Sequence, residues 1–213
     1  KVLVTAVGGD LGQAIVKALR LCDLTIDIHG CDMDADTVGS AFVKNFYPVP
    51  PATKEQEYLE ALGNICNNSS IDILVPASEP EINLLSKAPY ISCGTKIISQ
   101  PSSWINTYGD KLNCMEALSG KVELASFADG NSSSQIEQLI TESGFPLVVK
   151  PRRASGSRDF SIIYDTSELS KTLATMDSPI VQEYIESGLG EFSIGVFVCQ
   201  QFESMICFRR ETG

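Results

Sequence analysis

The stretch FPLVVKPRRASGSRDFSIIYD, residues 145–165, joins two apolar runs through a segment rich in basic residues, glycine and serine. The runs PLVVKP and FSIIYD have the composition of strands, and Lys150 stands where the first one ends. A lysine is costly to bury without a partner, and a Gly/Ser loop beside it can turn backbone N–H groups toward phosphate oxygens. The stretch therefore predicts two strands around a loop that closes over an anion.

The chain as a whole is acidic, which makes this basic segment unusual. Its 213 residues carry a formal net charge of −11, with 43% hydrophobic and 20% charged residues. This composition is typical of a soluble globular protein of one or two domains, and its charge argues against nucleic acid or an anionic membrane as the main partner. No apolar run approaches membrane-spanning length, and no signal peptide precedes the first strand. The basic segment thus predicts a small anionic ligand.

The cysteines indicate the cellular compartment. There are seven, scattered through apolar patterns without a Cys-x-x-Cys pair, and His29 is the only histidine. This favours reduced thiols in the core of a cytoplasmic protein over a disulfide framework or a zinc site. The chain starts inside a strand without Met and stops just after another strand, so we expect a fragment of a larger protein.

The first hundred residues alternate between strand and helix patterns. Apolar runs predict four strands, KVLVTAV, LTIDIHGCD, DILVPA and TKIISQ, and helical spacing predicts helices at GQAIVKALRL and KEQEYLEALGNIC. Such alternation is typical of an α/β fold with a doubly wound parallel sheet. We expect this domain to cover residues 1–101, because Gln100–Ser103 has the composition of a linker.

Residues 102–213 follow a different, α+β pattern. One helix is predicted to open with a capping box at Ser134-x-x-Glu137, and a later helix is predicted to open at Asp165-x-x-Glu168. The runs SPIVQEYI, EFSIGVFVC and ESMICFRR predict a strand and then a hairpin. The expected parts are linker helices over 102–144, a small α+β subdomain over 145–187 and the start of a larger subdomain over 188–213.

The glycine turn after the first strand admits two interpretations. Gly8, Gly9 and Gly12 face a helix start that can hold an anion, and Asp32 ends the second strand where a ribose-binding acid would lie, which suggests an NAD(P)-dependent reductase or epimerase. Glycines are also needed wherever a strand turns tightly into a packed helix. The spacing is GGxxG, so the sequence leaves both interpretations open.

Five motifs in this order resemble the ATP-grasp superfamily, most nearly its carbamoyl-phosphate-synthase-like and carboxylate–amine ligase branches. They are VTAVGGDLGQAIVKAL, ILVPASEPE, DKL, FPLVVKPRRASGSRDF and VQEYIESGLGEFSIGV. The resemblance covers nearly the whole chain. It implies a Rossmann-like pre-ATP-grasp domain followed by a partial ATP-grasp domain.

The resemblance also implies how ATP is bound. Lys111 and Lys150 correspond to the two lysines that contact the phosphates. The loop over 154–159 closes over these phosphates, with backbone donors from Ser155, Gly156 and Ser157.

The adenosine and co-substrate residues are implied in the same way. The hinge consists of Gln182, Glu183, Tyr184 and Ile185, and the backbone groups of Glu183 and Ile185 read adenine. Glu191 accepts from the ribose hydroxyls. The residues expected to face the co-substrate are Gly8, Gly9, Ser78 and Glu79.

The implied reaction is ATP-dependent ligation. A carboxylate or bicarbonate is activated as an acyl phosphate, and an amine then attacks it. The family uses no covalent enzyme nucleophile, so no catalytic residue is expected in the chain. It binds Mg2+ through a Glu and a Glu-x-Asn pattern, which we expect beyond residue 213. The chain alone is then inactive, and a non-catalytic nucleotide-binding module is an alternative. The oligomeric state is left open, a homodimer included.

Overall fold

A computed structural model describes residues 1–87, 91, 94–153, 160–186, 188, 190–199 and 202–210. The chain divides into two compact units, Lys1–Gly109 and Asp110–Gly213. The domain boundary expected from the sequence, between residues 101 and 102, falls at the start of helix α4 (Ser102–Tyr108), within the first unit.

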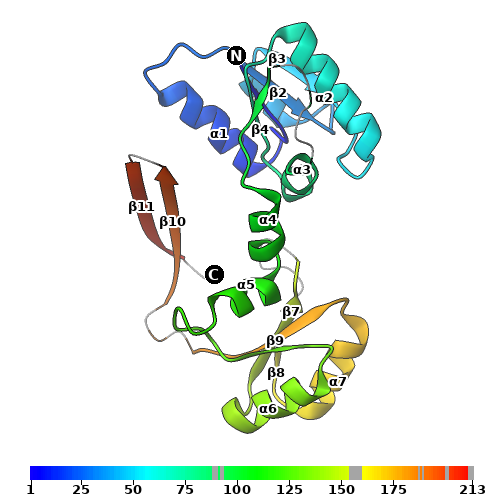
Figure 1. The fold of residues 1–213 in the computed structure, drawn as a ribbon, viewed down its shortest axis with the longest axis vertical. Coiled ribbons are helices and arrows are strands. Elements are labelled where there is room, and N and C mark those ends of the chain that lie inside the picture. The colour runs from blue at the N-terminus through cyan, green and yellow to red at the C-terminus, as the bar shows by residue number, and fades with distance from the viewer. Residues whose placement is uncertain are drawn as a thin grey trace. The chain divides into compact units, whose positions relative to one another are not determined.

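The first unit is built on a parallel sheet with the strand order β3-β2-β1-β4-β5 (Figure 1). Its strands are β1 (Val2–Val4), β2 (Ile28–Asp32), β3 (Asn45–Pro48), β4 (Ile73–Val75) and β5 (Lys96–Ile97). All four pairings are parallel, and the chain changes direction at β1, which lies between β2 and β4. The predicted doubly wound α/β sheet is confirmed.

Side chains of β1 alternate between the two faces of this sheet. Leu3 packs in the core under α2 (Glu55–Ser69) and α3 (Glu79–Leu85), while Val2 and Val4 pack with residues of α1 (Asp10–Leu21) on the other face. Both faces are therefore buried, as parallel sheets require.

Three elements of this unit were not predicted from the sequence: η1 (Val38–Phe42), β3 and α3. The residues of β3, NFYP, end in proline and lack an apolar run, so no strand pattern is visible. Helix α3 has Pro80 in its first turn, where the backbone N–H that proline lacks would have no partner within the helix. The second strand begins at Ile28 and not at Leu24, which is exposed.

The second unit contains an antiparallel sheet with the order β6-β9-β7-β8. Its strands are β6 (Phe127–Asp129), β7 (Leu147–Pro151), β8 (Ser161–Ile163) and β9 (Pro179–Glu183). The strands, helix and strand predicted after residue 146 are confirmed, whereas β6 was not predicted because it is only three residues long.

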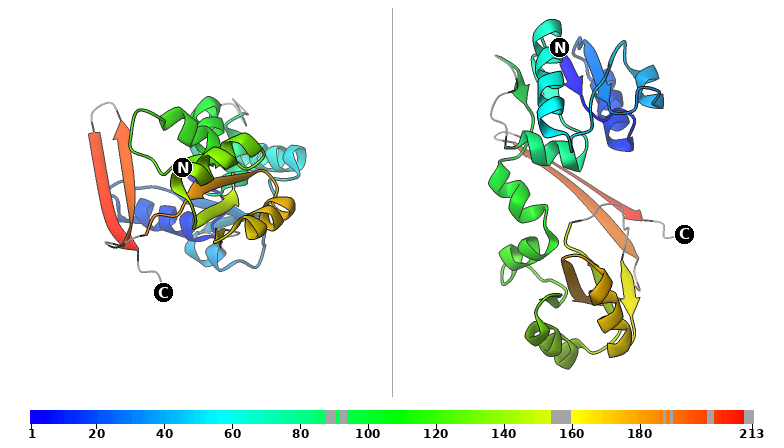
Figure 2. Two further views of the ribbon diagram at one scale, coloured as in Figure 1. Left: turned by 90° about the horizontal axis from the view of Figure 1, so that it is seen from below. Right: turned by 90° about the vertical axis from the view of Figure 1, so that its right-hand side faces the viewer.

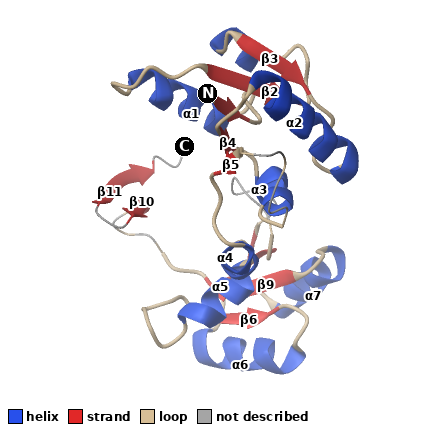
Figure 3. Ribbon diagram, turned by 45° about the horizontal axis from the view of Figure 1, so that its top comes forward, coloured by secondary structure: helices blue, strands red, loops and turns tan. Residues whose placement is uncertain are grey.

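The two faces of this sheet differ in character. Leu147, Val149 and Val181 belong to the core that includes residues of α6 (Ser133–Ser143) and α7 (Thr166–Thr175). Alternation along β7 therefore places Lys150 on the other face, over which α5 (Lys111–Leu118) lies (Figure 3).

The two helix starts predicted at Ser134 and Asp165 have different outcomes. Asp165 caps α7, and its Oδ1 accepts the N–H of Glu168 at 2.9 Å, as predicted. The box at Ser134 is wrong, because α6 begins at Ser133 after the N-cap Ser132. A turn closed by the N–H of Ser132 on the carbonyl of Asp129 at 2.9 Å fixes this earlier start.

The predicted hairpin is confirmed as β10 (Glu191–Cys199) and β11 (Phe202–Arg210), which pair from Glu191 with Arg210 to Cys199 with Phe202 (Figure 2). In the described ranges, no helix is long and apolar enough to cross a membrane.

The expectation that the cysteines are core residues is correct for only some of them. Cys31 and Cys66 are buried and Cys114 is half-buried. Three others are exposed, because they lie at the end of a helix or on the two-stranded hairpin: Cys22, Cys199 and Cys207. Cys93 lies outside the described residues.

Candidate functional site

Lys150 lies near the end of β7, on the face of the sheet that α6 and α7 do not cover. Partial burial disfavours its charge, the charge of Lys111 does the same, and the pKa of Lys150 is lowered. Among the residues that the structure describes, none forms a hydrogen bond or ion pair with its ammonium group. Lys150 is thus a half-buried cation beside a second cation.

Lys111 is the first residue of α5 and reaches the same strand end. Its Nζ donates to the carbonyl oxygen of Pro151 at 3.1 Å and to that of Arg152 at 3.4 Å. Its backbone N–H donates to the Arg152 carbonyl at 3.0 Å. The structure therefore brings the two predicted lysines together at the end of β7, while their contact with phosphate stays a prediction.

Asp110, the residue before α5, holds the arginines that follow β7. Arg152 Nε lies 3.0 Å from Asp110 Oδ1, and Arg153 Nε lies 3.4 Å from Oδ2. Arg152 and Arg153 therefore both pair with this one acid. Asp110 is the N-cap of α5, and Asp before an apolar periodic run is the usual sequence signal of such a cap.

The predicted hinge begins on β9, next to β7. The pairing of Val148 with Gln182 puts Gln182 on the same face as Lys150. Gln182 is buried, and its Nε2 donates to the sulfur of Met115 in α5 at 2.7 Å. Tyr184 and Ile185 follow the strand and have exposed side chains.

The backbone of the hinge offers one donor and one acceptor. The N–H of Glu183 donates to the carbonyl of Ser126 at 3.0 Å, and that of Tyr184 to the carbonyl of Pro146 at 3.3 Å. Turns and loops in the described ranges give no backbone hydrogen bond to the carbonyl of Glu183 or from the N–H of Ile185. This pair matches the edge of adenine, which presents an amino donor beside a ring-nitrogen acceptor.

Four other residues are predicted to bind the nucleotide. Ser155, Gly156 and Ser157 lie outside the described residues. Glu191 is the exposed first residue of β10. Its role at the ribose stays a prediction.

A cavity of about 670 Å3 opens in the first unit at the carboxyl ends of the parallel strands. Gly8, Gly9 and Ser78, all predicted to face the co-substrate, line it. Glu79 is exposed and does not, whereas Glu81 does. The sequence SEPE does not show which of its two glutamates turns inward.

Glu81 is buried and accepts three hydrogen bonds from hydroxyl groups. Its Oε2 accepts from the hydroxyl groups of Thr5 at 2.6 Å and Ser78 at 2.7 Å, and its Oε1 accepts from that of Tyr58 at 2.7 Å. Burial, followed by the charge of Glu81, raises the pKa of Tyr58, which therefore remains a donor. These bonds hold a carboxylate in the cavity wall.

The three glycines of the turn after β1 differ in whether a side chain would fit at their position. A Cβ on Gly12 would collide with the carbonyl oxygen of Ala6, and one on Gly8 would collide with the hydroxyl of Thr37 and lie 2.9 Å from Asp32 Oδ2. The carboxylate of Asp32 already accepts the N–H of Gly8 at 2.8 Å. A Cβ on Gly9 would have room, with its nearest neighbour at 3.5 Å.

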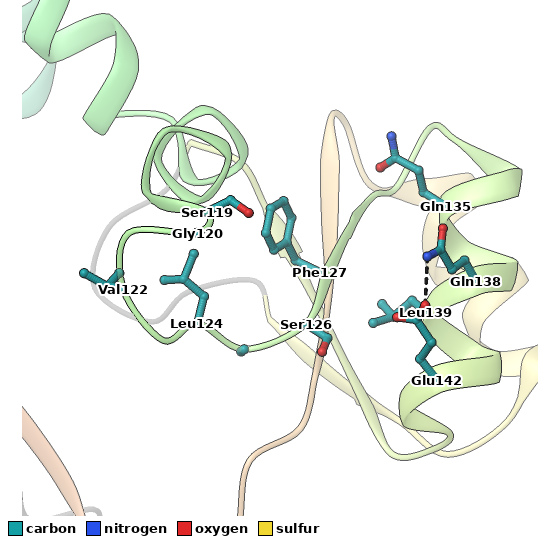
Figure 4. A pocket seen from close by; sticks show the side chains of 11 residues that line it. Ser119, Gly120, Val122, Leu124, Ser126, Phe127, Gln135, Gln138, Leu139 and Glu142 are labelled. Atoms are coloured by element: carbon teal, nitrogen blue, oxygen red, sulfur yellow. Dashed lines mark hydrogen bonds between the residues drawn. The ribbon is translucent and has the colours of Figure 1, made fainter.

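A second cavity, of about 470 Å3, lies in the second unit between the segment 119–127 and α6 (Figure 4). It adjoins the free edge of β6, and neither Lys111 nor Lys150 lines it. Gln138 and Glu142 on its wall bond to each other at 2.8 Å. The cavity is thus separate from the lysine pair.

Comparison with known proteins gives an independent view of the chain. Residues 2–98 match the family model of the PylC-like N-terminal domain. No curated protein matches.

Several solved structures share the fold. N5-carboxyaminoimidazole synthetase from Staphylococcus aureus is 18% identical, with a TM-score of 0.73 over 100% of this chain and 54% of that one. L-amino acid ligase from Bacillus licheniformis is 17% identical, with a TM-score of 0.71 over 96% and 49%. The biotin carboxylase domain of 2-oxoglutarate carboxylase from Hydrogenobacter thermophilus is 16% identical, with a TM-score of 0.64 over 87% and 44%.

The chain spans about half the length of these structures. At such identities the matches show the fold. They confirm the predicted fold class.

Proposed function

We propose that the chain is the ATP-binding portion of an ATP-grasp ligase that joins a carboxylate or bicarbonate to an amine. The observation that carries this proposal is the convergence of Lys111 and Lys150 at the end of β7. The backbone groups of Glu183 and Ile185 follow at the end of the neighbouring strand, β9. Two cations suit a polyphosphate, and the donor and acceptor suit adenine. Similar structures contain ADP, and one contains MgADP and bicarbonate.

The proposed reaction divides into two transfers. A carboxylate oxygen attacks the γ-phosphorus of ATP and forms an acyl phosphate. The bond between the γ-phosphorus and the oxygen that bridges it to the β-phosphate breaks, and ADP leaves. The amine then attacks the acyl carbon, inorganic phosphate leaves and the amine loses a proton. Lys111 and Lys150 assist the first transfer by offsetting the charge of the phosphates.

The side chains that could hold a magnesium ion are carboxylates and other metal-binding groups that lie close together. Within the described ranges, no group of three or more His, Cys, Asp or Glu side chains could hold a metal ion. Asp110, the acid nearest the lysines along the chain, is paired with Arg152 and Arg153. These residues do not fit a magnesium site, so no step is assigned to the metal, and its ligands beyond residue 213 remain a prediction.

The cavity of the first unit is proposed to bind the amine. Asp32, Asp34 and Glu81 line it, and no lysine, arginine or histidine is among its described lining residues. Apolar residues form much of the remaining wall: Met33, Val49, Pro50, Pro51, Ala52 and Pro80. A cationic amine with an aliphatic body suits this lining better than an anion does.

The same cavity bears on the reductase alternative. The N–H of Gly8, which a diphosphate would use, is donated to Asp32, and packing alone explains Gly8 and Gly12. We therefore favour ATP in the second unit over NAD(P) in the first.

Calorimetry on the full chain tests the nucleotide site. ATP should bind, NADH should not, and Lys150→Met should weaken ATP binding about tenfold or more, as expected for a lost charged hydrogen bond. Lys171→Met, at an exposed position of α7, is the matched control and should bind like wild type. Binding of NADH without ATP would overturn the proposal.

The amine site has its own test. In NMR titrations of the full chain, 1,5-diaminopentane should shift resonances of residues lining the cavity. Pimelate, with the same number of methylene groups and the opposite charge, should not. Shifts with pimelate alone would contradict the assignment.

A further inference from the structure

Asp110 is a buried carboxylate at the centre of the contacts between α5 and the end of β7. It is 5% exposed. Its Oδ1 accepts the backbone N–H groups of Leu112 at 3.1 Å and Asn113 at 3.2 Å, which caps α5. Arg152 Nε approaches both oxygens, at 3.0 and 3.2 Å. One side chain thus fixes both the helix start and the residue after the strand.

Arg152 returns bonds to the same helix turn. Its Nη2 donates to Asn113 Oδ1 at 3.0 Å, and its carbonyl oxygen accepts the backbone N–H of Lys111 at 3.0 Å. The first turn of α5 and the end of β7 are therefore joined in both directions. Because Lys150 lies on β7 two residues before Arg152, these bonds also set the position of Lys111 relative to Lys150.

The charges around Asp110 stabilise its ion pair with Arg152. Burial by itself would raise the pKa of Asp110, but hydrogen bonds from Arg152 and the N–H of Asn113, with the charges of Arg152 and Arg153, lower it. The carboxylate is therefore ionised at neutral pH. Its bonds to Arg152 also draw that guanidinium toward α5.

We propose that Asp110 is a positioning residue of the two-lysine site, which acts through Arg152 and the first turn of α5 to hold the ammonium group of Lys111 beside that of Lys150. The inference rests on the proposed function, since the lysine pair matters only if it binds an anion. It assigns no contact between Asp110 and the ligand. A carboxylate facing phosphate would repel it, and here the carboxylate is covered by its own donors.

Asp110→Asn separates the charge from the helix cap. Asparagine retains an oxygen that can cap α5, and it loses the charge that holds Arg152. We expect the dissociation constant of ATP, measured by calorimetry on the full chain, to rise about tenfold, as for a lost charge-assisted bond. Asp165→Asn is the matched control, because Asp165 caps α7 and has no ion pair within the described residues. It should bind ATP like wild type.

A double-mutant cycle distinguishes positioning from general destabilisation. Lys111→Met should weaken ATP binding about tenfold in wild type and less than about twofold in the Asp110→Asn background, because Lys111 is then no longer held in place. Two effects that simply multiply would show that Asp110 does not act through Lys111, and would overturn the proposal.

A second readout keeps this result apart from a failure of the proposed function. If wild type does not bind ATP, the proposed function fails, and the pKa of Lys150 in the ligand-free chain still tests Asp110. NMR of the ε-carbon measures the pKa of Lys150. In the Lys111→Met variant, this pKa is free of the influence of the Lys111 charge. Asp110→Asn should raise the pKa of Lys150 toward that value, and Asp165→Asn should not. A pKa unchanged in Asp110→Asn would overturn the inference.

Discussion

The ammonium group of Lys111 lies against the carbonyl oxygen of Pro151, the residue directly after Lys150, at 3.1 Å. Partial burial and this neighbouring charge both lower the pKa of Lys150. Two cations are thus held close together before any anion is bound. An arrangement of this kind costs stability in the free protein and favours an anion that satisfies both charges.

The first prediction concerns this cost. Lys150→Met should stabilise the ligand-free chain, because it replaces a half-buried cation with an apolar side chain of similar length. We expect the melting temperature to rise by about 2 °C or more, since 1 kcal/mol corresponds to about 2–4 °C at this chain length. The control Lys171→Met should leave the melting temperature unchanged. A Lys150→Met chain that is less stable than wild type would show that Lys150 makes a stabilising contact.

The second prediction is a pH dependence of ATP binding. The folded pKa of Lys150 lies below 10.5, so the side chain loses its proton at a lower pH than an ordinary lysine. The protonated form binds phosphate. Affinity for ATP should therefore be full at neutral pH and fall as the pH rises toward 10.5. Lys150→Arg keeps its charge across this range and should lose most of the dependence, measured by calorimetry at several pH values. The same slope in both proteins would assign the titration to another group.

The contribution of Lys150 to the free energy of unfolding should increase with pH, whereas the affinity for ATP should decrease. A lysine with a lowered folded pKa binds its proton less tightly in the folded than in the unfolded chain. Between the folded pKa and 10.5, the unfolded state holds more protons, so the contribution of Lys150 to the free energy of unfolding increases with pH. The difference in stability between Lys150→Met and wild type should therefore shrink as the pH rises through this window.

Local patterns explain how much of the site could be predicted. The alternation in PLVVKP places Lys150 opposite the core-facing Leu147 and Val149, and the sequence reveals this without any tertiary contact. Asp110 and Arg152 are 42 residues apart, and their pairing depends on how α5 packs on the sheet. A motif can place each residue on an element, but it does not show which elements meet.

The cavity of the first unit shows the same limit. In SEPE, Glu79 begins α3 and points to solvent, whereas Glu81 turns toward the sheet. The helix was not predicted from the sequence, so its inward face could not be identified. Tyr58, read from the sequence as one apolar position of a helix, also donates to Glu81.

The third prediction separates the glycines of the first turn. Gly12→Ala should cost about 1–3 kcal/mol in free energy of unfolding, because its Cβ would press on the backbone of Ala6 and lie 2.7 Å from Val7 Cα. Gly9→Ala should stay within about 0.5 kcal/mol of wild type, since Gly9 has room and an extended backbone at φ −84°. Urea unfolding followed by circular dichroism measures both. Equal losses would show that the turn is sensitive as a whole.

The fourth prediction concerns the hydroxyl groups around Glu81. Tyr58→Phe keeps the ring in the core but removes the hydroxyl that donates to Glu81 Oε1, which leaves that oxygen of the buried carboxylate without this partner. We expect a loss of about 1–3 kcal/mol in free energy of unfolding, the cost of an unsatisfied buried acceptor. Tyr164→Phe is the control, because Tyr164 is 66% exposed, and it should be neutral. If Tyr58→Phe is also neutral, the remaining bonds from Thr5 and Ser78 to Oε2 suffice to hold the carboxylate.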